Sequence, residues 1–160
     1  MKRKRHILFV CTGNCCRSQM AEAILARLGA DRFVARSAGS NPAGWVHPLV
    51  EAALAPLGIP VLEDARSKSW DEFETRPIDW VITLCDSAVQ EIPDWMNRCP
   101  VTHWFTPDPS FAPGTDEDRL VAAMRVAERL ALKIERLVTL DFDRLDKATL
   151  QARLEEISQL

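Results

Sequence analysis

The sequence predicts an α/β fold with one four-stranded parallel sheet and helices on both of its faces. Apolar segments of strand length alternate along the chain with amphipathic segments of helix length, which is the order of βαβ units. The first of them is apolar throughout, as expected of a strand buried on both faces. With 160 residues, 47% of them hydrophobic and 27% charged, the chain has the size and composition of one globular domain.

The first strand is expected at Ile7–Val10, followed by a helix over about Ser18–Leu28 in which apolar residues recur at helical spacing. Gly29 stands where this helix would end. Arg32–Ser37 alternates in polarity, which predicts the second strand, and Ala38–Pro42 is expected to form a loop.

His47–Leu57 is predicted to be the second helix, because Gly58 and Pro60 follow it and stop a helix well. A short helical turn is expected at Trp70–Phe73. The third strand is predicted at Asp79–Leu84, which is rich in β-branched residues.

A helix beginning at Asp86 is expected to run toward Met96 and to meet Pro93 on the way. Val101–Phe105 is predicted to be the fourth strand, and a long helix should cover about Thr115–Val138. The apolar stripe of that helix is expected at Leu120, Met124, Ala127, Ala131, Ile134 and Val138. A last amphipathic helix carries Leu150, Leu154 and Ile157. We therefore expect a main domain over residues 1–140 and a helical extension over residues 141–160 packed on it.

Composition and charge exclude several classes of protein. The chain has 20 Lys and Arg against 23 Asp and Glu, a net charge of −3, which argues against a nucleic-acid-binding surface. No apolar run reaches the length of a membrane span, and the one after the basic N-terminus is too short for a signal peptide. We expect a cytoplasmic protein with no membrane partner, whose five cysteines serve thiol chemistry more than a disulfide framework.

Chemistry-bearing residues follow three of the predicted strands. Cys11, Cys85 and Asp108 come after the first, third and fourth strands, and ligands of parallel sheets bind beyond the carboxyl ends of the strands. Between Cys11 and Arg17, the anion-binding loop Thr12, Gly13, Asn14, Cys15 and Cys16 joins a buried strand to a helix start. Its backbone N–H groups and the helix N-terminus can surround one tetrahedral oxyanion, and Arg17 can grip two oxygens of it. The positive potential of these N–H groups, the helix N-terminus and Arg17 should stabilise a Cys11 thiolate, to which Ser18 could donate a hydrogen bond. The alternative is a packed cysteine and a surface arginine.

The stretch ILFVCTGNCCRSQMAE resembles the phosphate-binding loop of the low-molecular-weight protein tyrosine phosphatase superfamily, and within it that of the arsenate reductases. The resemblance extends over about Arg5–Val138, with further similar motifs at Ser37-Ala-Gly39, Asn41-Pro42, Ser67-Lys68-Ser69, Thr83-Leu84-Cys85-Asp86, His103-Trp104 and Asp108-Pro109. It implies a Rossmann-like, three-layer, low-molecular-weight phosphatase-like fold.

The resemblance also implies roles for the site residues. Cys11 would be the nucleophile, Arg17 the oxyanion clamp, Ser18 the residue that tunes the thiolate, and Asp108 the general acid, while Asn14 shapes the loop. Without the anion-loop motif, a turn residue between prolines is the favoured interpretation of Asp108; with the motif, catalysis is favoured.

Cys85 has two interpretations: an apolar filler after a buried strand, or a second thiol that attacks the sulfur of a Cys11–arsenate adduct and forms a Cys11–Cys85 disulfide. The thioredoxin-coupled reductases carry a third cysteine where this chain has Ile92. Cys99 could replace it, or the external reductant could be glutathione with glutaredoxin, or mycothiol, in place of thioredoxin. Cys16 could form a protective disulfide with Cys11 under oxidation.

The remaining cysteine, histidine and tryptophan side chains give no further indication of a functional site. The cysteine spacing does not fit structural zinc, so we expect no metal and no tightly bound cofactor. His6, His47 and His103 show no catalytic partner in the sequence and are expected to be structural. The five tryptophans are scattered along the chain.

Three functions remain open at this point. The first is thiol-dependent reduction of arsenate to arsenite. The second is hydrolysis of aryl phosphates by a tyrosine phosphatase, which the complete absence of tyrosine disfavours, because Ser110 and Phe111 stand where the phosphatases usually place tyrosines. The third is a non-catalytic oxyanion-binding module, which would have no need of a nucleophile or an acid.

Overall fold

A computed structural model describes residues 2–160 and confirms the α/β fold. The single sheet has the strand order β2-β1-β3-β4, and every pair of neighbours is parallel. The strands are β1 (Arg5–Cys11), β2 (Phe33–Gly39), β3 (Trp80–Thr83) and β4 (Val101–His103). Since β1 pairs with both β2 and β3, the carboxyl end of β1 lies at the centre of one edge of the sheet.

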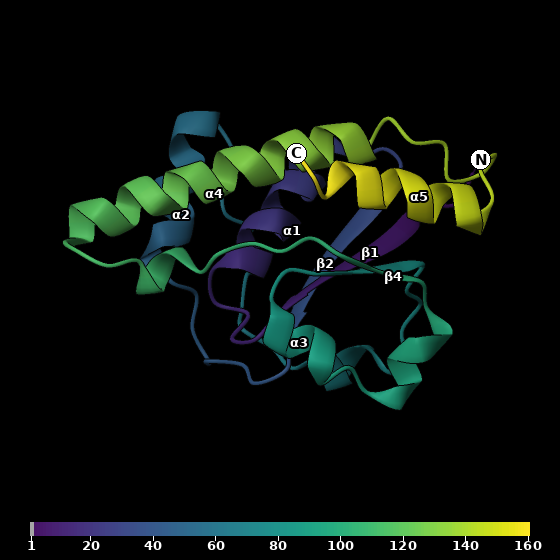
Figure 1. Ribbon diagram of the computed structural model, residues 1–160, viewed down its shortest axis with the longest axis horizontal. Coiled ribbons are helices and arrows are strands. Elements are labelled where there is room, and N and C mark those ends of the chain that lie inside the picture. Colours follow the sequence, from purple (N-terminus) through teal and green to yellow (C-terminus); the bar gives the residue numbers. More distant parts are fainter. Residues whose placement is uncertain (1) are drawn as a thin grey trace.

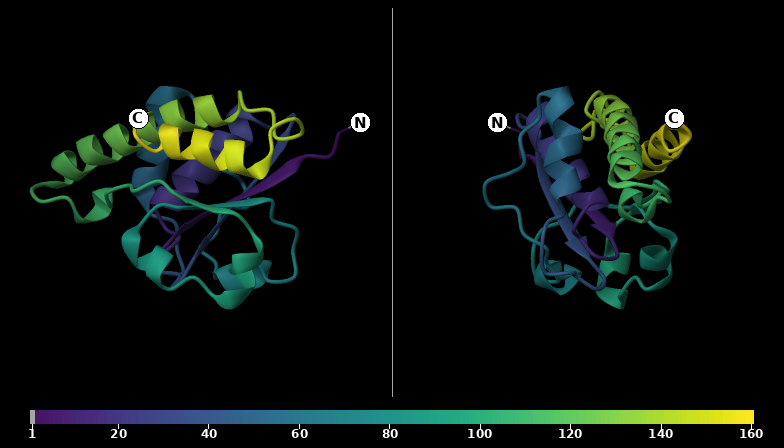
Figure 2. Two further views of the ribbon diagram at one scale, coloured as in Figure 1. Left: turned by 45° about the vertical axis from the view of Figure 1, so that its right-hand side comes forward. Right: turned by 90° about the vertical axis from the view of Figure 1, so that its left-hand side faces the viewer.

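Helices cover both faces of the sheet, as predicted. The α-helices are α1 (Arg17–Leu28), α2 (Pro48–Leu54), α3 (Asp86–Gln90), α4 (Asp116–Leu137) and α5 (Lys147–Ile157). Short 3₁₀ helices are η1 (Ala55–Leu57), η2 (Trp70–Phe73), η3 (Asp94–Arg98) and η4 (Pro109–Phe111). In Figures 1 and 2, α1, α4 and α5 lie over one face, and α3 lies with the teal 3₁₀ helices on the other.

The apolar strands supply the centre of the core. Ile7, Leu8, Phe9 and Val10 are fully buried between the helix layers, which explains why this segment is apolar without alternation. Trp104, directly after β4, is also fully buried, and its ring lies 6.4 Å from that of Phe9.

Prolines divide two of the predicted helices. The segment 47–57 forms α2 and then continues as η1, because Pro56 has no N–H with which to extend the α-helical bonding. Gly58 ends this segment in the left-handed region, with φ of 70°. Beyond Asp86, Pro93 separates α3 from η3.

The buried face of α4 differs from the predicted stripe, which was wrong in detail. Ala127 and Ile134 are buried as expected, but the other four predicted positions are only partly buried. The buried residues of α4 are Ala123, Val126, Ala127, Leu130, Lys133, Ile134 and Leu137. The helix packs on α1 and α2 together, so the groove between these helices decides which face is covered.

The C-terminal segment packs closely on the sheet. Leu154 O accepts a hydrogen bond from Trp104 Nε1 at 3.0 Å, and the Phe142 ring meets that of Phe33 edge-on with centroids 5.3 Å apart. Leu150, Leu154 and Ile157 are buried. These contacts support a division into residues 1–140 and an extension of residues 141–160, which stays a prediction.

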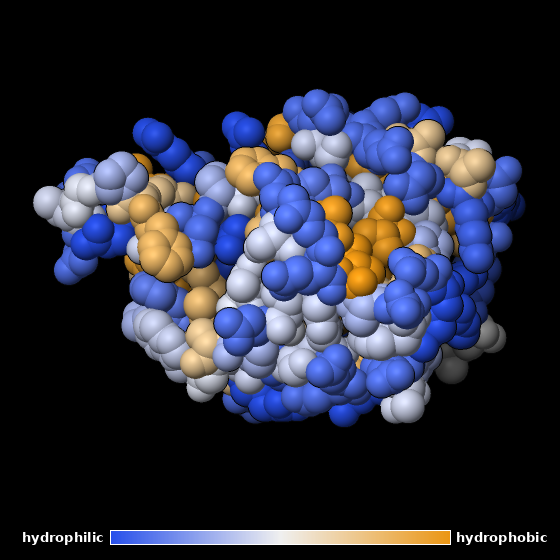
Figure 3. All heavy atoms as spheres, turned by 60° about the horizontal axis from the view of Figure 1, so that its bottom comes forward, coloured by the Kyte–Doolittle hydropathy of each residue, from blue (hydrophilic) through white to orange (hydrophobic). Residues whose placement is uncertain are grey.

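On the face of the molecule seen in Figure 3, apolar atoms form small separate groups among hydrophilic ones. From residue 2 to residue 160, no helix is both long and apolar enough to cross a bilayer.

Candidate active site

The loop between β1 and α1 turns its peptide carbonyls outward. The carbonyl oxygens of Thr12, Gly13 and Cys15 accept backbone N–H groups from the segment 41–47 at 2.8–2.9 Å. By contrast, the backbone N–H groups of residues 12–17 find no hydrogen-bond partner in the described chain. Because the N–H and carbonyl of a trans peptide unit point in opposite directions, the N–H groups of Gly13, Asn14 and Cys16, which share peptide units with these carbonyls, face the inside of the loop. The result is a cradle of donors for one oxyanion.

The start of α1 adds to this cradle. Cys16 is the N-cap residue and makes no side-chain hydrogen bond to the first turn. The first-turn N–H groups of the helix therefore stay available, and the positive end of the helix dipole points at the loop.

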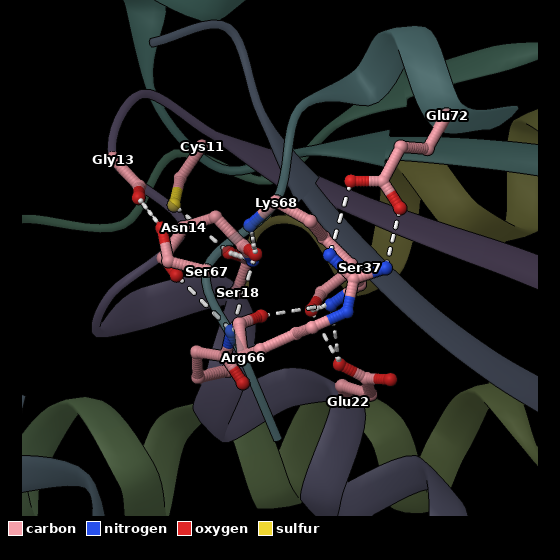
Figure 4. A network of polar contacts seen from close by, with 11 residues as sticks. Cys11, Gly13, Asn14, Ser18, Glu22, Ser37, Arg66, Ser67, Lys68 and Glu72 are labelled. Atoms are coloured by element: carbon pink, nitrogen blue, oxygen red, sulfur yellow. Dashed lines mark hydrogen bonds and ion pairs between the residues drawn. The ribbon is translucent and has the colours of Figure 1, made fainter. Parts of the chain in front are cut away.

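Asn14 fixes the hydrogen bonds around the Cys11 sulfur. Asn14 takes the left-handed conformation with φ of 47°, and its Oδ1 accepts the backbone N–H of Lys68 at 3.0 Å and Gln19 Nε2 at 3.1 Å. Its Nδ2 must then be the donor to Ser18 Oγ at 2.7 Å. With that oxygen acting as acceptor, the Ser18 hydroxyl is free to donate to Cys11 Sγ, 2.9 Å away (Figure 4).

A second group of polar contacts, formed by Lys68, Glu22 and Ser37, lies next to the residues that hold the anion loop. Lys68 Nζ lies 3.7 Å from Glu22 Oε1, and the Ser37 hydroxyl donates to the same carboxylate (Figure 4). Burial raises the pKa of Glu22 although Lys68 opposes the shift, and burial lowers the pKa of Lys68. Sequence reasoning missed this network, although the motifs Ser37-Ala-Gly39 and Ser67-Lys68-Ser69 were the signal that could have found it.

Arg17 and Asp108 face each other across the cradle. Arg17 Nη2 lies 3.4 Å from Asp108 Oδ2, and Nη1 donates to Thr106 O at 3.1 Å. The other carboxylate oxygen of Asp108 accepts Ser110 N at 3.0 Å and Ser110 Oγ at 2.7 Å. Asp108 is thus held at the N-terminus of η4 with one oxygen toward the loop.

A cavity of about 430 Å³ opens above these groups. Cys11, Arg17 and Asp108 line it, and so does Cys15. Its further lining residues are Thr12, Gly13, Cys16, Ala43, Trp45, His47, Ser110 and Phe111. Trp45 and Phe111 are 51% and 84% exposed, so they stand at the rim of the cavity.

Cys85 lies next to the loop although it is far away in sequence. Its Sγ is 3.3 Å from Thr12 Oγ1 and 3.6 Å from Ser87 Oγ. Burial raises the pKa of the Cys85 thiol, but hydrogen bonds from Thr12, Ser87 and the Ala88 N–H, with the charge of Arg17, lower it overall. The structure thus puts a second thiol, biased toward its reactive form, beside the residue that follows Cys11.

The remaining thiols differ from Cys85, and all five cysteines are free. Cys99 precedes β4 and bonds to Ile78 O at 3.6 Å, so it lies at the opposite edge of the sheet from Cys11. Cys99 is therefore separated from Cys11 by the length of the sheet, and its role as a replacement for the missing third cysteine stays a prediction. Burial raises the pKa of Cys99, Cys15 and Cys16. Ile92 packs against the core.

His103 has a carboxylate partner that the sequence did not reveal. Its Nε2 lies 2.9 Å from Asp86 Oδ1 and its Nδ1 2.8 Å from Thr83 Oγ1. His47 lines the cavity, but its Nδ1 accepts Leu49 N as the cap of α2. Among residues 2–160 no three His, Cys, Asp or Glu side chains gather in a way that could hold a metal ion.

An oxyanion in this cradle would lie beside the Cys11 sulfur, which belongs to a residue type that can act as a nucleophile, and the Asp108 carboxyl, which belongs to a residue type that can donate a proton. Fold and site together define a class: enzymes that use a cysteine to act on tetrahedral oxyanions.

Comparisons with known proteins narrow this class. Residues 6–102 match the family model described as low molecular weight phosphotyrosine protein phosphatase. The arsenate reductase of Halalkalibacterium halodurans is 35% identical over 132 residues, which cover 82% of this chain and 94% of that protein. The chain belongs to the low-molecular-weight phosphotyrosine protein phosphatase family, among relatives that are arsenate reductases.

Two further similarities bear on the chemistry. The glutaredoxin arsenate reductase of a Synechocystis species is 33% identical over 105 residues, covering 66% of this chain and 79% of that protein. A solved structure described as an arsenate reductase in the phosphate-binding state is 30% identical, with a TM-score of 0.71, over 84% of this chain and 97% of the other.

Proposed function

We propose that this protein reduces arsenate to arsenite with two of its own thiols and an external thiol reductant. The observation that carries the proposal is the proximity of Cys85 to the anion loop, with Cys85 Sγ 3.3 Å from Thr12 Oγ1. A phosphatase has no use for a second thiol at this place, whereas a reductase needs one. The arsenate reductase relatives support the same reaction.

The reaction starts as a substitution at arsenic. Arsenate binds among the N–H groups of residues 12–17 and takes Arg17 away from its contact with Asp108. The Cys11 thiolate, held by the Ser18 hydroxyl at 2.9 Å, attacks arsenic and forms an S–As bond. One arsenate oxygen leaves as water after accepting a proton from Asp108. Arsenic is still in oxidation state V after this step.

The second step is the reduction. The Cys85 thiolate attacks Cys11 Sγ, so that an S–S bond forms and the S–As bond breaks. The electron pair of the broken bond stays on arsenic, which leaves as arsenite, while the two sulfurs are oxidised to a Cys11–Cys85 disulfide. Movement of the short helix α3, which begins directly after Cys85, brings the two sulfurs together.

An external thiol then reduces the disulfide and closes the cycle. Ile92 stands at the third-cysteine position and Cys99 lies at the far edge of the sheet, so neither position supplies a thiol that relays the disulfide as the third cysteine of the thioredoxin-coupled reductases does. We propose direct attack on it by glutaredoxin with glutathione, by thioredoxin, or by a small thiol such as mycothiol. Each of these works in the reducing cytoplasm, where we place the protein's activity.

Cys85→Ser separates this reaction from phosphate-ester hydrolysis. We expect arsenite production to fall on the order of a hundredfold or more, because the sulfur that accepts the disulfide is gone. Hydrolysis of p-nitrophenyl phosphate should stay nearly unchanged, because water resolves that intermediate. Cys99→Ala is the matched control and should leave both activities intact. Arsenite should be measured with thioredoxin, with glutaredoxin plus glutathione, and with mycothiol plus mycoredoxin in turn; undiminished release from Cys85→Ser would refute the role of Cys85.

Aryl phosphate hydrolysis remains the second candidate. The exposed rings of Trp45 and Phe111 at the rim of a 430 Å³ cavity favour it, because they could flank a flat substrate group that arsenate lacks. Efficient turnover of p-nitrophenyl phosphate, with no arsenite formed under any of the thiol systems, would make it the main activity. Oxyanion binding without either turnover would identify a binding module.

A further inference from the structure

A second cavity lies on the other side of the segment that carries Asp108. The long connection from β4 to α4 runs alongside α4 (Figures 1 and 2), and a space of about 400 Å³ opens between them. Phe105, Pro107 and Pro109 form one wall, and Val126 and Leu130 on α4 form the other. Apolar walls and a volume in this range are typical of sites for small organic ligands.

Three cations of α4 also line this cavity. Arg125, Arg129 and Lys133 follow each other at intervals of four residues, so they share one face of the helix over about 12 Å. None of the three takes part in an ion pair or a side-chain hydrogen bond anywhere in residues 2–160. The cavity's one carboxylate, that of Asp108, is engaged by Arg17 and Ser110.

Lys133 is the deepest of these cations. It is only 2% exposed, and its Nζ lies 6.0 Å from the centre of the Trp104 ring. A lysine this enclosed is normally paired, because desolvation of its charge is costly. Its Nζ is not fully enclosed by protein atoms, and Lys133 lines the cavity, so the cavity offers room for an anion that residues 2–160 do not supply. The two arginines are exposed, so they stand at the outer end of the same row.

We propose that this cavity binds a small amphiphilic organic anion, with its carboxylate on Lys133 and Arg129 and its apolar body between Val126, Leu130 and the proline-rich wall. The site is separate from the oxyanion cradle and shares with it only the segment around Asp108. A ligand in this cavity would contact the segment around Asp108 on the side away from the oxyanion cradle. Binding of the ligand can therefore change the affinity for phosphate, and phosphate then changes the affinity for the ligand by the same factor.

The probes are 2-naphthoate and its neutral analogue 2-naphthamide, titrated into the ¹⁵N-labelled full-length protein with excess inorganic phosphate to occupy the cradle. We expect saturable NMR shifts of the Thr106, Val126 and Lys133 amides with naphthoate, and at least tenfold weaker binding of the amide, because a desolvated charge pair is lost. Lys133→Met keeps the apolar stem and should weaken naphthoate binding at least about tenfold. Lys147→Met, at an exposed position of α5, should leave it unchanged.

Thermal unfolding will test whether Lys133→Met is folded. Its Tm should equal or exceed that of the parent protein, because the substitution removes a charge from a largely buried position. The proposal fails if Lys133→Met binds naphthoate as well as the parent does, or if naphthamide binds equally well. Displacement of naphthoate by phosphate, with shifts confined to residues 12–17, also overturns it. None of these measurements depends on arsenate reduction.

Discussion

Around the Cys11 sulfur, one amide side chain sets the direction of the hydrogen bonds. Asn14 accepts from Lys68 N and Gln19, so it must donate to Ser18, and Ser18 then donates to Cys11. This chain of contacts directs one hydrogen-bond donor at the Cys11 sulfur.

Arg17→Lys tests the oxyanion clamp. A lysine keeps the charge but cannot bond two oxygens of one anion in a plane. We expect phosphate to bind at least about tenfold more weakly by calorimetry, which corresponds to about 1.4 kcal/mol. Arg32→Lys, at an exposed position before β2, is the control and should bind phosphate normally. Equal affinities for Arg17→Lys and the parent protein would remove Arg17 from the site.

Lys68→Met tests the buried pair behind the loop. Without the ammonium, the pKa of Glu22, already raised by burial, should rise further. In the folded variant, Glu22 then keeps its proton at a pH at which the unfolded chain has released it. The contribution of this proton to the free energy of unfolding is fully present below the ordinary glutamate pKa, and it is lost as the pH rises through the raised pKa of Glu22. Urea unfolding at about pH 5 and about pH 8 should show a larger loss at the higher pH. The control Lys147→Met should change the free energy of unfolding by the same small amount at both pH values. If Lys68→Met lost equal stability at both pH values, the coupling between Lys68 and Glu22 would be contradicted.

At the scale of elements, the site depends on how closely the end of β2 approaches the anion loop. A Cβ on Gly39 would collide with the carbonyl oxygen of Thr12 and lie 3.0 Å from Asn14 N. Glycine is needed here for the contact and not for its dihedral angles, because no positive φ is found at Gly39. The β2 end therefore acts as a template against which the loop is shaped.

Gly39→Ala should displace the loop. We expect a loss of about 1–3 kcal/mol in the free energy of unfolding, and a clear loss of phosphate affinity in the same protein. Gly58→Ala provides the comparison, because Gly58 has φ of 70° and no atom near its Cβ position. It should cost about 1 kcal/mol of stability through backbone strain without changing phosphate binding. A Gly39→Ala protein that binds phosphate like Gly58→Ala would show that the contact does not shape the loop.

At the scale of the whole molecule, the strand order assembles the site. Because β1 lies between β2 and β3, the segments after three strands meet at one edge: the Gly39 turn, the anion loop and Cys85. The segment after β4 then brings Asp108 to Arg17. On the opposite side of this assembly, α5 closes the core around Trp104.

Leu154→Ala tests the contribution of the C-terminal helix. Leu154 is fully buried, so its truncation should lower the free energy of unfolding by about 2–5 kcal/mol. Phosphate affinity of the folded variant should be unchanged, because Leu154 is not among the residues that line the oxyanion cavity. Glu155→Ala, exposed on the same helix, should cost little. A loss below about 1 kcal/mol for Leu154→Ala would mean that α5 is not part of the cooperative fold.

The sequence by itself determined the α/β fold, the four strands and the anion loop. These follow from contiguous residues: an apolar run makes a doubly buried strand, and Cys11 to Arg17 forms one continuous turn in which Asn14, a residue type that tolerates it, takes the left-handed conformation. The end of the helical segment 47–57 at Gly58 was predictable for the same local reason.

Only the tertiary structure decided which distant residues meet. Cys85 lies beside Thr12, Asp108 meets Arg17 and His103 bonds to Asp86, whereas Cys99 is carried to the opposite edge. Strand order and register control these distances, and neither is encoded in the spacing of the residues along the chain. The buried face of α4 was decided in the same way, because the helices packed against it, and not its most apolar line, determine which side chains lose contact with water. Lys133 is therefore only 2% exposed and has no ion-pair partner within residues 2–160, a feature that no local pattern of the sequence predicts.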